Sequence, residues 1–102
     1  MKEYKDSELD PILHQPVRTK IVAYLATRGT ATFTELKQAL NITDGNLEGH
    51  IKKLSEAKYI SNKRKTGKGR PQTVYSLTSS GLAAFTDYVR ALQKLLPSNL
   101  NV

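Results

Sequence analysis

The chain has 102 residues, the size of a single domain, and its 38% apolar content can form a core without disulfide support. The absence of cysteine excludes disulfide frameworks, thiolate metal sites and cysteine nucleophiles, and it fits a reducing compartment. The polar N-terminus is not a signal peptide, and no apolar run approaches the roughly 18 residues that span a bilayer. We therefore predict a soluble cytoplasmic protein without membrane contact.

The excess positive charge is confined to one stretch of the chain. The formal net charge is +7. Residues 51–70 contain eight basic residues and a single acid, Glu56, whereas the basic and acidic residues elsewhere cancel. A local basic patch on an otherwise neutral domain is typical of a protein that binds a polyanion. The alternative is a solvated lysine-rich loop.

Two helices are expected near the N-terminus. Residues 1–8 are predicted to be disordered or frayed. Asp10, which precedes a proline, is typical of a helix start and predicts a short helix over residues 11–14. A second helix is predicted over residues 16–28, with Gly29 ending it. Its apolar stripe consists of Val17, Ile21, Tyr24 and Leu25.

The next segment, TATFTELKQALN, carries signals for a short helix and a tight turn. Thr32 and Glu35 have the spacing of a capping box, in which both side chains bond to amides at the helix start. Asn41 tolerates the left-handed conformation that ends helices, and Thr43 can cap another helix almost at once. Two short helices joined so closely are typical of a helix-turn-helix. The first is predicted to bury Phe33, Leu36, Ala39 and Leu40.

The second helix of this pair contains two glycines within TDGNLEGHIKKL and is predicted to end near Lys58. Its core stripe is Leu47, Ile51 and Leu54. Gly45 and Gly49 lie on the opposite side, where each costs about 1 kcal/mol of helix stability relative to alanine. Glycine has no side chain and lets this face of the helix lie close to another surface, which explains why the cost in stability is tolerated, most clearly at Gly49. The alternatives are a loose or partly 3₁₀ helix start and packing between glycine-faced helices.

The last third of the chain predicts a hairpin and then a helix. The strand-forming residues are Tyr59, Ile60, Val74, Tyr75 and Leu77, and a turn is marked by Gly67, Gly69 and Pro71. The first strand and the tip are strongly basic. Thr78 caps a final helix that Pro97 ends. Its predicted apolar stripe is Leu82, Phe85, Val89, Leu92 and Leu96.

This order of elements resembles a known family of small regulators. The chain is similar to the winged helix-turn-helix domains of compact MarR-like and ArsR-like transcriptional regulators. The similarity lies in the segment FTELKQALNITDGNLEGHIKKLSEAKYI, the basic hairpin that follows it, and the segment YSLTSSG. The resemblance implies an α+β, mainly α fold with a three-helix core, a two- or three-stranded β-hairpin wing and a C-terminal helix. Residues 9–78 would form the DNA-binding domain, and residues 79–100 a C-terminal helix for dimerisation.

The resemblance also implies a function. It predicts a sequence-specific transcriptional regulator that binds double-stranded DNA, as a homodimeric repressor of a pseudo-palindromic operator. Helix 43–58 would enter the major groove, and wing residues 63–71 would lie on the backbone or in the minor groove. The candidate DNA-binding residues are Thr34, Thr43, Gly45, Asn46, Gly49, His50, Lys52, Lys53, Lys63, Arg64, Lys65, Lys68 and Arg70.

Side-chain chemistry suggests individual roles within this set. Asn46 can bond adenine in bidentate fashion, and Arg70 is preferred to Arg64 for insertion into the minor groove. His50 either donates to a phosphate or packs at the edge of the core. Asp44 and the acid one turn later would repel phosphate, although an acid in a first helical turn is also favoured by the helix dipole.

Leucines in excess of what one small core needs predict a homodimer. The candidate interface residues are Leu9, Ile12, Leu13, Phe85, Tyr88, Val89, Leu92, Leu95, Leu96 and Leu100. The alternative is that they cover the core of their own chain.

Other classes of function fit the sequence less well. Two histidines and no clustered acids predict no enzyme, no metal site and no cofactor, a departure from metal-sensing ArsR proteins. The chain is short for the ligand pocket of full-length MarR-type regulators, so no effector is assigned. The alternative function is a winged-helix protein–protein or RNA-binding module. Basic charge on both helix and wing favours duplex DNA over an acidic protein, and the absence of an aromatic stacking set disfavours single-stranded RNA.

Overall fold

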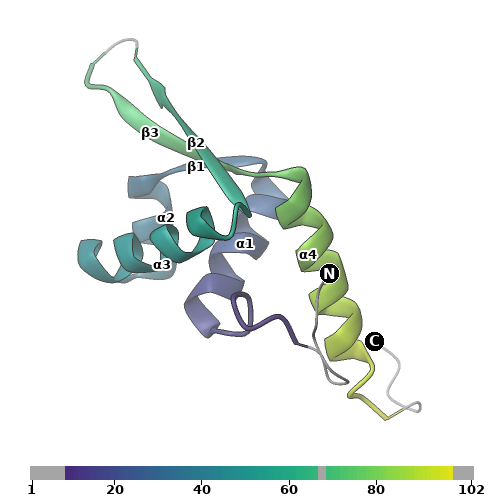
Figure 1. Cartoon of the computed structure of the whole chain (residues 1–102). Coiled ribbons are helices and arrows are strands. Elements are labelled where there is room, and N and C mark those ends of the chain that lie inside the picture. The colour runs from purple at the N-terminus through teal and green to yellow at the C-terminus, as the bar shows by residue number, and fades with distance from the viewer. Residues whose placement is uncertain (1–8, 67–68, 98–102) are drawn as a thin grey trace.

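The fold is a helical body from which a β-hairpin projects (Figure 1). The computed structural model describes residues 9–66 and 69–97. In chain order the elements are α1 (Pro16–Arg28), β1 (Thr30–Thr32), α2 (Phe33–Leu40), α3 (Asp44–Glu56), β2 (Ile60–Lys65), β3 (Gln72–Leu77) and α4 (Ser79–Gln93). The hairpin β2–β3 is the wing. This architecture confirms the predicted mainly helical fold with a three-helix core, a wing and a C-terminal helix.

A third strand joins the wing to the body. The antiparallel sheet has the order β1-β3-β2, and Tyr75 in the middle strand pairs with Ala31 of β1 and Asn62 of β2. The position of β1 could not be located from the sequence, because its three residues show no strand periodicity and its conformation depends on pairing with a distant strand. Because β1 continues directly into α2, the sheet is attached to the helix-turn-helix.

The predicted helix caps are present. The side chains of Thr32 and Glu35 form the capping box of α2, with Glu35 Oε1 accepting from Thr32 N at 2.8 Å. The turn after α2 contains Asn41 in the left-handed region, at φ 55° and ψ 55°. Thr43 then caps α3, and Thr78 caps α4. These local bonds fix the tight connection between α2 and α3.

The core forms around α1, which packs against α2, α3 and α4. The fully buried large side chains of the core are Leu13, Ile21, Val22, Leu25, Leu36, Leu47 and Leu54. The predicted core stripe of α3 is therefore confirmed, with Ile51 also buried. The prediction for Ala39 is wrong: α2 is short, and only Leu36 is fully buried on it while Ala39 is exposed.

The predicted N-terminal helix is a turn. The carbonyl oxygen of Asp10 accepts from the amides of Leu13 and His14, and Asp10 Oδ1 accepts from Ile12 N at 2.9 Å. The turn cannot continue into a helix because Gln15 precedes a proline, which disfavours helical backbone, and Gln15 is extended at φ −152° and ψ 125°. We refer to residues 10–14 as the N-terminal turn.

The helix α4 begins as predicted, but its predicted apolar stripe covers the core only in part. Its buried residues are Gly81, Ala84 and Tyr88. Of the predicted stripe, Phe85 and Leu92 pack against the core, whereas Leu82 and Leu96 are exposed. A Cβ at Gly81 would overlap the carbonyl group of Tyr59, so the helix is seated against that backbone through its glycine. This contact sets the rotation of α4. The helix also ends at Gln93, before Pro97, and α3 ends at Glu56 rather than Lys58.

The residue Tyr59 links three parts of the fold. Its carbonyl oxygen accepts from Thr78 N at 3.0 Å, at the start of α4. Its hydroxyl donates to Oδ2 of Asp10, which is 3% exposed. The base of the wing is therefore bonded to both α4 and the N-terminal turn.

Candidate nucleic-acid interface

The outward face of α3 is open. Gly45, Gly49, Lys52 and Lys53 are exposed on the side opposite Leu47, Ile51 and Leu54. A Cβ built on either glycine meets nothing within 4 Å. No neighbour among the described residues therefore requires glycine there, and α3 is regular helix through both positions. The two intramolecular alternatives, a loose helix start and glycine-faced packing, do not account for these residues.

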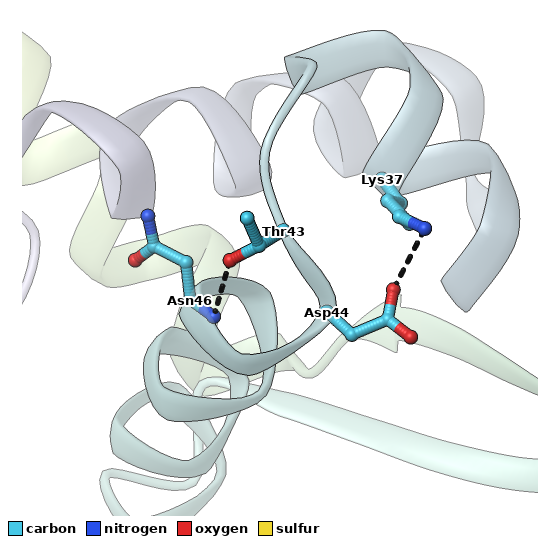
Figure 2. Close-up of polar contacts among 4 residues, drawn as sticks. All are labelled: Lys37, Thr43, Asp44 and Asn46. Atoms are coloured by element: carbon cyan, nitrogen blue, oxygen red, sulfur yellow. Dashed lines mark hydrogen bonds and ion pairs between the residues drawn. The ribbon is translucent and has the colours of Figure 1, made fainter.

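The start of α3 presents a polar group beside this face. Thr43 Oγ1 accepts from the backbone amide of Asn46 at 3.2 Å, so the cap uses the main chain of Asn46 (Figure 2). The side-chain amide of Asn46 forms no hydrogen bond with a described residue. That amide projects on the side of α3 away from Lys37 and Asp44 (Figure 2). Asn46 is exposed. Its side chain is thus placed for the bidentate base contact that its chemistry allows.

Of the three acids of α3, two form ion pairs, and the third, Glu48, acts electrostatically on a tyrosine of β3. Lys37 Nζ lies 2.9 Å from Asp44 Oδ1, an ion pair that joins α2 to α3 (Figure 2). The charge of Asp44 is thereby countered close to where a phosphate would approach. Burial, and secondarily the carboxylate of Glu48, raise the pKa of the Tyr75 hydroxyl, which places Glu48 on the flank of α3 nearest β3. Sequence reasoning missed Lys37, although the tight turn between α2 and α3 implies that the two helices adjoin.

The side chain of His50 lies at the edge of the core. It is half-buried, and its Nδ1 lies 3.1 Å from Nη1 of Arg18 on α1. Burial, with a smaller effect from Arg18, lowers the pKa of His50. The residue is therefore a neutral imidazole near pH 7. Of the other α3 candidates, Lys52 forms an ion pair with Glu56 at 3.5 Å, whereas Lys53 has no ion pair among the described residues.

The wing divides its basic side chains between two faces. Arg64 pairs with Thr73, in phase with Tyr75 on the core side of the sheet. Lys63 pairs with Val74 and Lys65 with Gln72, so both lie on the opposite face, because side chains alternate along a strand. All three side chains are exposed. The predicted site residue Lys68 lies outside the described residues.

A cleft brings three further candidates together. It has a volume of about 990 Å³ and lies between the wing and the start of α2. Thr34 from the first turn of α2 lines it together with Lys65 and Arg70. The structure thus places one group of candidates along α3 and a second around this cleft, whereas Lys63 and Arg64 lie elsewhere on the wing.

The family of the chain is decided by its match to a known domain. Residues 17–96 match the family model described as the winged helix DNA-binding domain. The chain belongs to this family. The match includes α1 to α4, both groups of candidate residues and the whole described part of the wing.

This winged helix protein is similar in sequence to one archaeal protein and in structure to known regulators. An uncharacterized protein of Methanocaldococcus jannaschii is 40% identical over 84 residues, which are 82% of this chain and 91% of the relative. The structure of a transcriptional regulator homologue from Pyrococcus horikoshii OT3 is similar over 100% of both chains, with a TM-score of 0.84 and 28% identity. Bacillus subtilis PadR, solved in complex with operator DNA, shares the fold at 17% identity and a TM-score of 0.64, over 74% of this chain and 48% of PadR.

The winged helix protein is accordingly a DNA-binding protein of the transcriptional-regulator class. Its family and fold are those of regulators that are generally non-enzymatic. Within the described ranges, no helix is long and apolar enough to cross a membrane. Nor do the described residues contain a group of three or more potential metal ligands.

The predicted dimer residues divide by burial. Leu13 and Tyr88 are 0% and 5% exposed within the single chain, so they belong to its own core and offer no surface to a second copy. The turn and helix geometry that buries them was not visible in the sequence. Leu9, Ile12, Phe85 and Leu92 are partly buried against the same core, and Val89 is half-buried. Leu95 and Leu96 are 61% and 41% exposed, and Leu100 lies outside the described residues.

Proposed function

We propose that this winged helix protein is a homodimeric, sequence-specific repressor of a pseudo-palindromic operator. In this proposal α3 lies in the major groove and the wing lies along the backbone or in the minor groove. The supporting observation is the outward face of α3, where Gly45 and Gly49 have open space beyond them. Asn46 and Lys53 flank that face, are exposed and have no ion pair or side-chain hydrogen bond to a described residue.

We infer the individual contacts from side-chain chemistry and exposure. Asn46 would bond a base edge, most naturally adenine, and Lys53 a phosphate or a guanine. The cleft is lined by Thr34, by the basic Lys65 and Arg70 and by the acidic Glu35, and its two basic side chains would face the duplex backbone. Arg70 remains our choice for minor-groove insertion.

A binding titration tests sequence specificity. Duplexes selected from a random library are compared with scrambled duplexes by fluorescence anisotropy at two salt concentrations. We expect a selected sequence to bind at least about a thousandfold more tightly than a scrambled one, the lower limit for specific sites. Binding that is steeply salt-dependent but equal for both duplexes would refute a specific regulator, and no salt-sensitive binding would refute nucleic-acid binding altogether.

A matched pair of lysine variants tests whether α3 is the helix that contacts the DNA bases, which we call the reading helix. Lys53→Ala should reduce the slope of log affinity against log salt by about 1, because one phosphate contact is lost. Lys20 is also exposed and lies on α1, so Lys20→Ala removes the same charge outside the proposed interface. Equal effects of the two substitutions would show that only net charge matters and would count against α3 as the reading helix.

We also propose that the segment starting at residue 79 mediates dimerisation. The exposed Leu95 and Leu96, with half-buried Val89, form an apolar surface beyond the core contacts of α4. A two-fold dimer would present its two α3 helices about 34 Å apart, one turn of DNA. We expect sedimentation to show a dimer at tens of micromolar that Leu95→Asp dissociates and Leu82→Asp, at the other end of α4, does not. A monomeric wild type would refute the dimer, and the reverse pattern would refute this surface.

Repression by occlusion has its own test. The selected operator is placed over the start site of a reporter promoter, and transcription is measured in a purified system. We expect transcription to fall as the protein concentration approaches the dissociation constant of the operator. Increased transcription would indicate an activator.

A further inference from the structure

The side chain of Arg18 joins the N-terminal turn to the proposed reading helix, although it is absent from the predicted DNA-binding residues. Its Nε donates to the carbonyl oxygen of Ile12 at 2.6 Å. Its Nη1 lies 3.1 Å from His50 Nδ1. Ile12 is itself held by Asp10, whose Oδ1 accepts from Ile12 N at 2.9 Å. The guanidinium of half-buried Arg18 is therefore fixed at two points, one on the N-terminal turn and one on α3.

The chemistry of this pair determines the form of the imidazole. A guanidinium carries only donors and does not deprotonate, so Nδ1 of His50 must accept the bond. A neutral imidazole with a bare Nδ1 carries its proton on Nε2. The two ring nitrogens project in roughly opposite directions, so the Nε2–H points away from Arg18. The lowered pKa of His50 agrees with a neutral ring.

The position of His50 gives this donor a place in the interface. His50 follows Asn46 by one helical turn, on the same flank of α3, and it is adjacent to Gly49. The residue is half-buried there, so it is not fully covered by the core. A donor held in one orientation on that flank can reach a phosphate oxygen beside the bases that Asn46 would read.

We propose that Arg18 is a positioning residue of the DNA interface, which holds His50 in one orientation and in the neutral Nε2–H form so that it donates to a DNA phosphate. This inference rests on the proposed reading function of α3. It assigns Arg18 a role that lysine cannot fill, because one ammonium group cannot reproduce the fork that spans Ile12 and His50. It also makes the N-terminal turn part of the support of the interface, through Ile12.

The tautomer can be measured on the free protein. Long-range ¹H–¹⁵N spectra distinguish the two ring nitrogens, and His14→Gln identifies the signals of His50, since the chain has two histidines. We expect a single Nε2–H form in the wild type. Arg18→Lys should produce a mixture of tautomers, because one ammonium group cannot hold Nδ1 as a fixed acceptor. A dominant Nδ1–H form in the wild type would overturn the proposal.

A double-mutant cycle tests the link to DNA. Arg18→Lys keeps the charge and should weaken operator binding about fivefold, a coupling within the range expected for contacting residues. In a His50→Gln background, whose amide donates without a tautomer, the same substitution should have little effect. Equal losses in both backgrounds would show that Arg18 only braces α1 against α3, and they would overturn the positioning role. Arg18→Gln repeats the cycle should the lysine variant fold poorly.

The control and the two possible failures are separable. Arg28→Lys lies on the same helix, where Arg28 stacks over Tyr24 at 5.0 Å, and it should leave both the His50 spectrum and operator affinity unchanged. If the wild type binds no duplex, that result alone refutes the proposed function. If the wild type binds but the cycle shows no coupling between positions 18 and 50, the function stands and the positioning role is overturned.

Discussion

The most informative single substitution is at Gly49 in the middle of α3. A Cβ at Gly49 would meet no described residue beyond its own helical turn within 4 Å, and the backbone there is regular helix. Gly49→Ala therefore removes the cost of glycine without a clash and should raise the free energy of unfolding by about 0.8–1 kcal/mol, and Gly49→Leu by nearly as much. For a domain of this size, each 1 kcal/mol corresponds to a rise of roughly 4–8 °C in Tm.

Operator affinity should change in the opposite direction. A leucine at Gly49 projects from the outward face and would hold α3 away from the groove. Losing one good bidentate base contact costs about 1–3 kcal/mol, so we expect Gly49→Leu to weaken binding roughly 5- to 150-fold. Gly49→Ala adds only one methyl group and should have a smaller effect.

Thermal melting and anisotropy titrations on the same samples measure both quantities. Ala26→Leu is the control, since Ala26 is an exposed helical position on α1 and the substitution adds apolar bulk outside the interface. A more stable Gly49→Leu protein with unchanged operator affinity would refute close approach to DNA. A less stable one would refute the inference that the space beyond Gly49 is open.

Three further predictions concern the fold and its pH dependence. Gly81→Ala should lower the free energy of unfolding by at least about 2 kcal/mol, because its Cβ would overlap the Tyr59 carbonyl. The control Gly45→Ala should not destabilise the protein, because its Cβ meets no such neighbour. Chemical denaturation compares the two variants, and equal effects would contradict the close contact at Gly81. Tyr59→Phe should cost about 1–3 kcal/mol in the same assay, because the buried carboxylate of Asp10 loses a donor; a change below about 0.5 kcal/mol would show that this bond contributes little. The pKa of His50 is lowered on folding, so the unfolded chain binds a proton at His50 more readily and the free energy of unfolding falls as pH drops below about 6.5. Urea melts above and below this pH should show a smaller fall in the free energy of unfolding for His50→Gln than for the wild type. An identical fall would contradict the lowered pKa.

The sequence predicted the elements whose signals are local. The bounds of α1 and the caps at Thr32, Thr43 and Thr78 depend on residues within one turn of each other, and all are confirmed. Asn41 likewise adopts the left-handed conformation that its chemistry allows. Short-range bonds of this kind can be read from spacing alone, and they are sufficient to specify the helix-turn-helix.

The features that the sequence did not predict depend on contacts between distant segments. The rotation of α4 is set by Gly81 against Tyr59, and the apolar pattern of α4 did not indicate that Gly81 is buried. The strand β1 exists through its pairing with β3. At the interface, Arg18 reaches a histidine 32 residues away, and no spacing rule indicates that pair. The glycine face of α3, by contrast, was predictable, because one helix contains all of it.

The register of the wing constrains how its length can vary. Ile60 pairs with Leu77 at the base of the hairpin, and Arg64 lies four residues further along β2, on the same face of the sheet. Inserting one residue between them would move Arg64 to the face that Lys63 and Lys65 now occupy, and would exchange the lysines in turn. Inserting two residues would lengthen the wing and leave every basic side chain on its present side. Changes in wing length that keep the same DNA contacts should therefore occur in even numbers of residues per strand, a parity that a count of basic residues cannot reveal.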